Sequence, residues 1–356
     1  MKLKLIIFSI LIFVFCYHAM AQKPIPNKNP TTTTKPPVVK ERIYSTIAFG
    51  SCNKEDKPQD MWTSIVQNNP DLWIWLGDIV YADTEDPTFL ANKFNKLKTN
   101  ELYKNLLKKT RVIGVYDDHD FGVNNGGKEY KMKKQSRDIL FNFLEIPKDS
   151  PFRKREGAYQ SYTFKSTNNN KIKVILLDTR YFRDELEETN SSKFRFYINK
   201  NGDILGKEQW TWLENELKTS DANLNIICTS FQLIPDDHPF EKWSNFPEAR
   251  KHFFEVLYKI KPKNVLLLSG DRHFAEFSCM DLKWLPYTLV EVTSSGMTHV
   301  REQKENTESH YRCGEFADKM NFGLLKVDWD EDNIPTVTVQ IRGHKNALLI
   351  EKIINF

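Results

Sequence analysis

Six short apolar runs recur along this chain, and each run stops at a cluster of polar residues. The runs have strand length and are rich in Ile, Val and Leu, which is typical of strands buried on both faces of a sheet. The early runs are 43–49 before Gly50-Ser51-Cys52-Asn53, 72–76 before Gly77-Asp78, and 112–116 before Asp117-Asp118-His119-Asp120. The later runs are 173–177 before Asp178-Thr179-Arg180, 225–228 before Ser230-Phe231-Gln232, and 265–268 before Ser269-Gly270-Asp271-Arg272-His273. This recurrence predicts a sheet whose strand ends carry the polar residues.

Helix candidates lie between these runs, at residues 128–144, 206–217 and 247–260. In the second candidate, Trp210 and Leu213 repeat at helical spacing and are expected to cover the sheet. The alternation predicts a layered α/β protein. In such a protein, polar clusters that are distant in sequence can converge on one cleft at the strand ends.

The chain changes character after residue 287. The runs at 287–292, 323–327 and 336–341 have no long helices between them. They predict a second, more antiparallel sheet packed on the first. The rim of the cleft is expected in loops at 83–100 and 182–202.

The N-terminal residues resemble a secretory signal. Lys2 and Lys4 precede an apolar run at 5–15, and Ala19-Met20-Ala21 follows as a cleavage pattern. We therefore predict a signal peptide at 1–21, a Pro/Thr-rich linker at 22–42, and one domain over 43–356. This predicts a secreted protein, periplasmic or extracellular. A retained anchor is the alternative, although the run is short for a bilayer span.

Charge and cysteine content narrow the function classes. The chain has 51 basic and 47 acidic side chains, and this balance argues against a nucleic-acid partner. Nothing in the sequence predicts a protein partner. Cys279 and Cys313 flank a segment with loop character and could form a disulfide, whereas Cys228 lies in an apolar run and is expected to be a buried thiol. The sequence leaves the pairing open.

The residue types at the strand ends favour a metal site. Asp, His, Tyr and Cys hold multivalent cations, and the chain has neither a Gly-x-Ser-x-Gly elbow nor a phosphate-binding Gly-x-x-x-x-Gly-Lys loop. In Gly77-Asp78-Ile79-Val80-Tyr81, a carboxylate and a phenol lie three residues apart just past a strand. Phenolate and thiolate stabilise a trivalent cation such as Fe3+, and a carboxylate can bridge it to a neighbouring ion.

Taken in order, these motifs resemble those of the PhoD-like alkaline phosphatases. That family belongs to the calcineurin-like metallophosphoesterases and is similar to purple acid phosphatases. The likeness covers about residues 43–300. It implies a layered α/β metallophosphoesterase-like fold with two packed mixed β-sheets flanked by helices. It also implies a metal-dependent phosphoric ester hydrolase, in which hydroxide on an Fe3+/Ca2+ centre attacks phosphorus.

The resemblance also implies a role for each site residue. The implied metal ligands are Cys52, Tyr81 and His273 for Fe3+, Asp78 as the bridge, Asp118 and Asp271 for one or more Ca2+ ions, and Gln232 at a position where relatives carry a histidine. Three further residues are implied in catalysis. Arg180 would bind the phosphoryl oxygens, His119 would contact phosphate or protonate the leaving group, and Asn124 would contact metal or phosphate.

Structural roles remain alternatives at these positions. Cys52 could be an ordinary buried thiol, and Arg180 could pair with Asp178 or Asp184. The carboxylates around His119 could form a turn, but they would repel one another strongly without a cation. His299 fits a structural role and a substrate contact equally well.

Several functions also remain alternatives. The expected substrate is a small-molecule or lipid phosphate ester, and a loose association with a membrane or cell surface stays open. A phosphodiesterase or phospholipase D-like enzyme would use the same ligands. A non-catalytic exported binding protein is the alternative from another class, and it would have no need of a bridging carboxylate.

Overall fold

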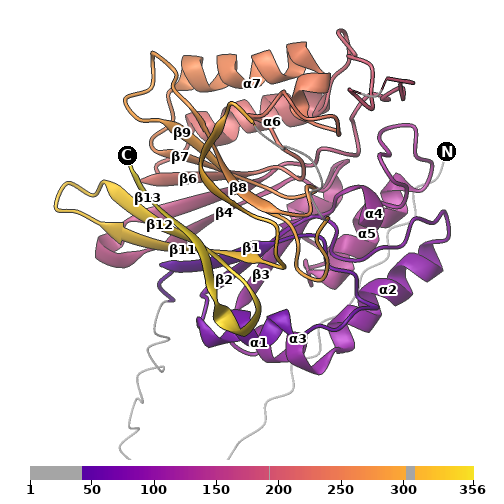
Figure 1. Ribbon diagram of the computed structural model, residues 1–356, viewed down its shortest axis with the longest axis horizontal. Coiled ribbons are helices and arrows are strands. Elements are labelled where there is room, and N and C mark those ends of the chain that lie inside the picture. The colour runs from indigo at the N-terminus through magenta and orange to yellow at the C-terminus, as the bar shows by residue number, and fades with distance from the viewer. Residues whose placement is uncertain (1–41, 192, 302–308) are drawn as a thin grey trace, which may run out of the picture. The chain divides into compact units, whose positions relative to one another are not determined.

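Two β-sheets pack face to face, and each mixes parallel and antiparallel strands (Figure 1). This computed structural model describes residues 42–191, 193–301 and 309–356, and residues 42–356 form one compact unit. The predicted signal peptide and nearly all of the predicted linker lie outside the described residues. None of the described helices has both the length and the apolar character needed to cross a membrane.

The first sheet has six strands and the second has seven. In spatial order, the first contains β13 (Leu348–Asn355), β12 (Pro335–Arg342), β11 (Phe322–Trp329), β1 (Thr46–Gly50), β2 (Leu72–Leu76) and β3 (Arg111–Val115). The second contains β10 (Arg312–Ala317), β8 (Ala275–Met280), β9 (Leu289–Ser294), β7 (Val265–Ser269), β6 (Leu224–Cys228), β5 (Lys171–Leu176) and β4 (Gln160–Lys165).

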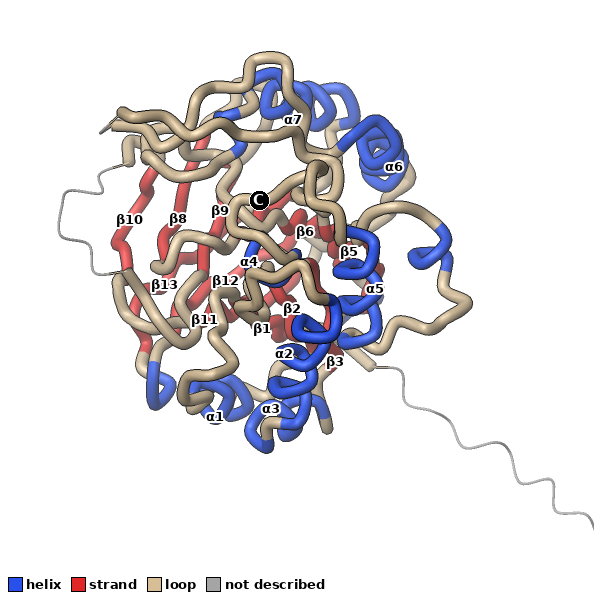
Figure 2. Tube along the Cα trace, turned by 90° about the vertical axis from the view of Figure 1, so that its right-hand side faces the viewer, coloured by secondary structure: helices blue, strands red, loops and turns tan. Residues whose placement is uncertain are grey.

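Helices cover the outer faces of both sheets (Figure 2). The α-helices are α1 (Met61–Gln67), α2 (Pro87–Thr99), α3 (Glu101–Leu107), α4 (Asp118–Phe121), α5 (Lys133–Phe143), α6 (Gly206–Lys218) and α7 (Pro247–Ile260). Short 3-10 turns are η1 (Pro151–Lys154), η2 (Thr167–Asn169), η3 (Trp243–Asn245) and η4 (His344–Asn346). The three helices expected from the sequence correspond to α5, α6 and α7.

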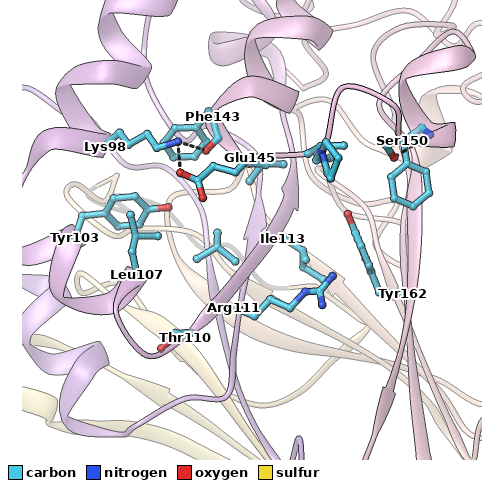
Figure 3. A pocket seen from close by; sticks show the side chains of 15 residues that line it. Lys98, Tyr103, Leu107, Thr110, Arg111, Ile113, Phe143, Glu145, Ser150 and Tyr162 are labelled. Carbon is cyan, nitrogen blue, oxygen red and sulfur yellow. Dashed lines mark hydrogen bonds and ion pairs between the residues drawn. The ribbon is translucent and has the colours of Figure 1, made fainter. Parts of the chain in front are cut away.

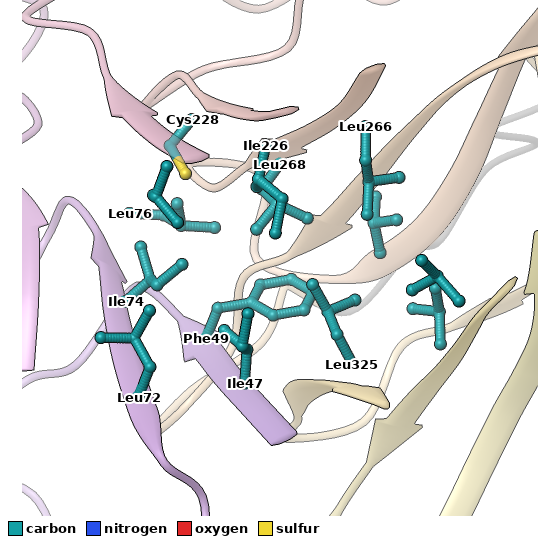
Figure 4. Packing of buried hydrophobic residues seen from close by; sticks show 14 of the residues in the cluster. Ile47, Phe49, Leu72, Ile74, Leu76, Ile226, Cys228, Leu266, Leu268 and Leu325 are labelled. Carbon is teal, nitrogen blue, oxygen red and sulfur yellow. The ribbon is translucent and has the colours of Figure 1, made fainter. Parts of the chain in front are cut away.

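The inner strands β2, β6, β7 and β9 are buried on both faces, as continuous apolar runs predict. Ile74 and Leu76 of β2 point into the core between the sheets, where they join Phe49 of β1 and Leu268 of β7 (Figure 4). The alternate residues of β2 pack on the other face in the cluster that contains helices α1 to α3. This packing fixes the strand ends, and with them the loops that follow.

The predicted division into an early sheet and a late sheet is wrong. Strand β9 pairs in parallel with β7, whereas β11 pairs antiparallel with β1. The late strands therefore extend both sheets, because β1 and β7 each offer an unpaired edge that a later strand satisfies with backbone hydrogen bonds.

The stretch at 83–100 is also not a loop throughout, since α2 occupies most of it. Asp86 caps this helix by accepting a hydrogen bond from the Thr88 backbone N–H, and Pro87 occupies its first turn. Asp-Pro at a helix start is a recognisable signal in the sequence.

The cysteines behave as their surroundings predict. A disulfide joins Cys279 of β8 to Cys313 of β10, with 5.7 Å between their Cα atoms. Cys52 and Cys228 are buried free thiols.

Candidate metal centre

One polar cleft lies where the carboxyl ends of strands from both sheets meet. Four residues implied as metal ligands line it together, namely Asp78, Asp118, Asp271 and His273. They follow β2, β3 and β7, which are separated widely in sequence. The fold therefore brings together side chains that the sequence carries far apart.

The backbone is unusual where these side chains enter the cleft. Cys52, Asp78 and Asp271 each lie two residues past a strand and have φ angles of 59°, 50° and 67°. His273 also has a positive φ, 59°. This left-handed region is uncommon for residues other than glycine and concentrates at functional sites.

Gly270 lets the second sheet approach the first at this point. A Cβ atom at this position would lie 2.5 Å from Ser51 Oγ and 2.7 Å from the Leu76 carbonyl oxygen. Any larger residue would push the end of β7 away from the ends of β1 and β2. Glycine here is therefore a requirement of the cleft.

The first group of donor atoms surrounds one carboxylate oxygen. Cys52 Sγ lies 3.2 Å from Asp78 Oδ2, and the Tyr81 hydroxyl lies 2.9 Å from the same oxygen. The Tyr81 hydroxyl is also 3.1 Å from His273 Nε2. Thiol, phenol, imidazole and carboxylate thus converge, and this combination suits a trivalent or transition-metal ion.

A second group shares Asp78 with the first. Ligand atoms of Asp78, Asp118 and His119 lie within 4.8 Å of one another, as do those of Cys52, Asp78 and His273. Asp78 Oδ1 is buried and has no hydrogen-bond partner among the described residues. A buried carboxylate oxygen without a partner is costly, and a second cation would satisfy it. The residues present therefore fit a centre with more than one metal ion.

The electrostatics point the same way. Burial raises the pKa of Asp78 well above its usual range, with Asp118 and Asp117 adding to the shift against the opposing charge of His119. Burial and then Asp117 raise the pKa of Asp271 to about 8. Burial and Asp78 likewise raise the pKa values of the Cys52 thiol and the Tyr81 phenol. Burial thus disfavours the ionised forms of these four side chains, and bound cations would be needed to keep them ionised.

His119 is oriented by a residue that sequence reasoning missed. Its Nδ1 lies 2.8 Å from Asp83 Oδ1, and its ring stacks on Tyr81 with 4.2 Å between centroids. Burial opposes the charged ring, but Asp78 and Asp83 together raise the pKa of His119 to about 10. In the sequence, the only sign of the His119–Asp83 pair is that Asp83 follows closely after Asp78, another residue of the site.

Arg180 does not line the cleft. It is fully buried, and its guanidinium bonds to Asp117 Oδ1 at 2.6 Å and to Glu241 Oε2 at 2.7 Å. Arg183 lies 3.1 Å from the other oxygen of Glu241. The structural alternative considered for Arg180 therefore matches its surroundings, although its acidic partners are not the ones expected. Its partner Asp117 is the N-cap of α4, so Arg180 is tied to the start of the helix that carries Asp118.

Two other predicted residues lie at the margin. Gln232 is buried, donates to Glu276 Oε1 at 2.7 Å, and accepts from Arg272 Nε at 3.1 Å. It is thus placed behind Arg272, outside the cleft lining. Asn124 is exposed on the cleft rim, and the next residue, Asn125, donates its backbone N–H to Asp118 Oδ2.

One histidine beside the cleft and three arginines that line it were not emphasised by the motifs. The His299 ring lies 4.5 Å from that of His273, centroid to centroid, and its Nε2 is buried without a hydrogen-bond partner among the described residues. Arg195, Arg272 and Arg301 line the cleft as well. Their spacing in the sequence gives no sign that they meet.

Two other places on the molecule differ from this cleft. Asp236, Asp237 and His310 could also hold a cation, but they are more exposed and already pair with one another. A larger hollow of about 420 Å³, which we call the edge groove, lies beside Tyr103 of α3, Arg111 of β3 and Tyr162 of β4 (Figure 3). None of the metal-capable groups found among the described residues lines it.

Comparisons with known proteins identify the family and the fold of the chain. Residues 47–334 match the family model described as PhoD-like phosphatase. A curated relative, alkaline phosphatase D of Bacillus subtilis (strain 168), is 28% identical, and the match covers 64% of this chain and 46% of the relative. The chain therefore spans about half the length of that relative. A solved structure of PhoD superposes with a TM-score of 0.63 at 16% identity, covering 87% of this chain and 72% of that one, which supports the fold.

Proposed function

The chain belongs to the PhoD-like phosphatase family, and on that premise we propose that it hydrolyses phosphate esters in a metal-dependent reaction at this cleft. The observation that carries the proposal is Asp78, which belongs to both groups of metal-capable side chains. A carboxylate shared in this way is the arrangement that a polynuclear centre requires.

We assign the ligands by donor chemistry. Cys52, Tyr81 and His273 would hold Fe3+, because thiolate and phenolate stabilise a trivalent ion. Asp78 would bridge, and Asp118 and Asp271 would hold Ca2+, which prefers hard oxygen ligands. When bound, such ions supply an activated water and positive charge for attack on phosphorus.

The remaining residues would protonate the leaving group, contact the phosphoryl oxygens or hold other site residues in position. Asp83 holds Nδ1 of His119, so Nε2 remains for hydrogen bonding to a leaving-group oxygen. Asn124, on the rim, can donate its amide to a phosphoryl oxygen. Arg180 would act by positioning, because its guanidinium is committed to Asp117 and Glu241.

We further propose that the enzyme is exported and acts on small-molecule or lipid phosphate esters. The signal-like N-terminus and the Cys279–Cys313 disulfide support export, because disulfides persist in oxidising compartments. A loose association with a membrane or cell surface is compatible with this proposal.

The test combines metal analysis with paired substrates. The protein purified with its native metals should contain iron and calcium and show a visible tyrosinate-to-iron absorption band. It should release product from an aryl phosphate monoester or from the matching diester, and calcium should increase the rate. Absence of turnover on both esters in protein reconstituted with Fe3+ and Ca2+ would overturn the hydrolase proposal. Activity in a colourless, iron-free protein would overturn only the iron assignment.

A further inference from the structure

Two guanidinium groups meet one aromatic ring in the cleft. Arg272 Cζ lies 4.8 Å from the centre of the Phe240 ring, and Arg301 Cζ lies 4.3 Å from the same centre. All three residues line the cleft that holds the candidate metal ligands. Each contact is a cation–π interaction, which holds an arginine in place without neutralising it.

Neither guanidinium forms an ion pair with an acidic residue in the described part of the chain, and Asp271 and Glu276 act on Arg272 only from beyond ion-pair distance. Arg272 donates its Nε to the neutral amide oxygen of Gln232, and its terminal nitrogens have no acceptor among the described residues. The Arg301 side chain is exposed and forms no hydrogen bond or ion pair with a described residue. Two positive groups that converge on one ring repel each other, and a bound anion would relieve the repulsion.

Their positions fix where that anion would lie relative to the chemistry. Arg272 stands between Asp271 and His273 in the chain, and the Arg301 backbone N–H donates to the His273 carbonyl at 3.2 Å. The arginine pair is therefore tied to the loop that supplies two candidate ligands. A phosphoryl group at the metal ligands would have its substituent directed into the same cleft as these two side chains.

We propose that Arg272 and Arg301 form a subsite for a second anionic group of the substrate. The preferred substrate is then a phosphate ester that carries a further phosphate or carboxylate on its alcohol. This inference rests on the proposed hydrolase function and adds the substrate class. Arginine suits the task, because its planar fork can make two parallel charge-assisted hydrogen bonds to either kind of oxyanion.

Three matched three-carbon phosphate esters test the subsite. They carry at the far carbon a hydroxyl group (1,3-propanediol monophosphate), a second phosphate (1,3-propanediol bisphosphate) or a carboxylate (the phosphate ester of 3-hydroxypropanoate). With the metal-loaded protein, kcat/KM for at least one of the two esters with a second anionic group should exceed that of the hydroxyl ester by about tenfold or more, the size expected for hydrogen bonds to a charged group. The better of the two charged esters identifies the anion.

Arg301→Gln should remove most of this preference, chiefly by raising KM for the charged ester. It should leave kcat/KM for the hydroxyl ester within about twofold, because the proposal gives Arg301 no contact with the reacting phosphoryl group. Arg301→Lys, which keeps the charge and loses the fork, should retain an intermediate preference. The control is Arg111→Gln in the edge groove, where another arginine lies 5.2 Å from an aromatic ring, that of Tyr162 (Figure 3).

The outcomes separate the two proposals. If wild-type protein hydrolyses all three esters equally, the subsite is overturned while the hydrolase stands. If Arg301→Gln lowers kcat/KM for all three by the same factor, Arg301 serves the reacting phosphoryl group or the fold, and the subsite is again overturned. If wild-type protein hydrolyses neither these three esters nor any aryl ester, the hydrolase proposal fails, and the subsite proposal fails with it.

Discussion

Two buried clusters of charge adjoin in this molecule, and they differ in how the charge is balanced. The first, which we call the arginine cluster, contains Asp117, Glu241, Arg180 and Arg183, all buried and joined by ion pairs. Two acids and two bases neutralise each other there. The net charge of this cluster is therefore balanced by its own side chains.

The second cluster, which we call the acidic cluster, has no such balance. Asp78, Asp118 and Asp271 are accompanied by a thiol and a phenol that could also become anions. Burial disfavours the ionised forms of Asp78 and Asp271, and only Asp118 is held ionised, with a pKa of about 2, since Arg180 and His119 overcome its burial. Charge balance, rather than the number of charges, therefore distinguishes the candidate metal centre from the scaffold beside it.

The largest expected effect comes from Asp78→Asn in the acidic cluster. We expect the variant to lose bound metal and kcat/KM to fall by roughly a thousandfold or more, because Lewis-acid stabilisation supplies several kcal/mol and each 1.4 kcal/mol is about tenfold. Metal content by elemental analysis and kinetics on an aryl phosphate measure both.

The same substitution should behave differently after chelation. In metal-free protein, Asp78→Asn should leave the free energy of unfolding unchanged or higher, because it removes a carboxylate that burial disfavours. Asp236→Asn, in the exposed acidic group, is the matched control and should keep both metal and turnover. Wild-type turnover by the Asp78 variant would contradict the ligand assignment.

Arg180→Met should produce the next largest effect, on stability. Removing this guanidinium leaves Asp117 and Glu241 buried without their main partner, which costs about 3–5 kcal/mol of unfolding free energy. Urea unfolding of the metal-loaded proteins measures the loss. Arg195→Met is the comparison, because it removes an ion pair with Glu188 on the surface. The side chains of Arg195 and Glu188 are 41% and 61% exposed, so the loss of this pair should cost less than about 1 kcal/mol of unfolding free energy. Equal losses in both variants would show that the arginine cluster does not support the fold.

The contrast also explains what the sequence could reveal. Each strand run and the polar residues after it are local signals, so the positions of Asp78 and Asp271 past their strands were predictable. The pairing of β11 with β1 was not, because backbone hydrogen bonds carry no mark in the side-chain pattern. The loop at 83–100 could have been recognised as helical from Asp86-Pro87 alone.

Arginine roles were the least predictable part of the site. A guanidinium suits a phosphate and a pair of carboxylates equally well, so Arg180 could be assigned either role from its motif. Its surroundings are decided by Glu241, which lies 61 residues further along the chain. The meeting of Arg272 and Arg301 at Phe240 likewise depends on loops whose path no local pattern encodes.

Glu291 of β9 gives the smallest and most specific test, because it is a buried acid that is held by backbone N–H groups and not by a cationic side chain. Its carboxylate accepts backbone N–H bonds from Leu233 at 2.9 Å and Ile234 at 2.7 Å. Burial nevertheless raises its pKa from 4.5 to about 7. The folded state therefore takes up a proton that the unfolded state releases, and stability should fall as pH rises from about 4.5 to 7.

Glu291→Gln should remove this dependence. The two proteins should unfold at similar urea concentrations at pH 5, where the folded wild type is protonated. At pH 8 the variant should be more stable by at most about 3 kcal/mol, because the wild type then buries a charge. Glu255→Gln on α7, where the side chain is 59% exposed, is the control and should show no such trend. A pH-independent difference for Glu291 would mean that backbone N–H donors alone can hold a buried carboxylate ionised, and unbalanced charge in the acidic cluster would then no longer imply a cation.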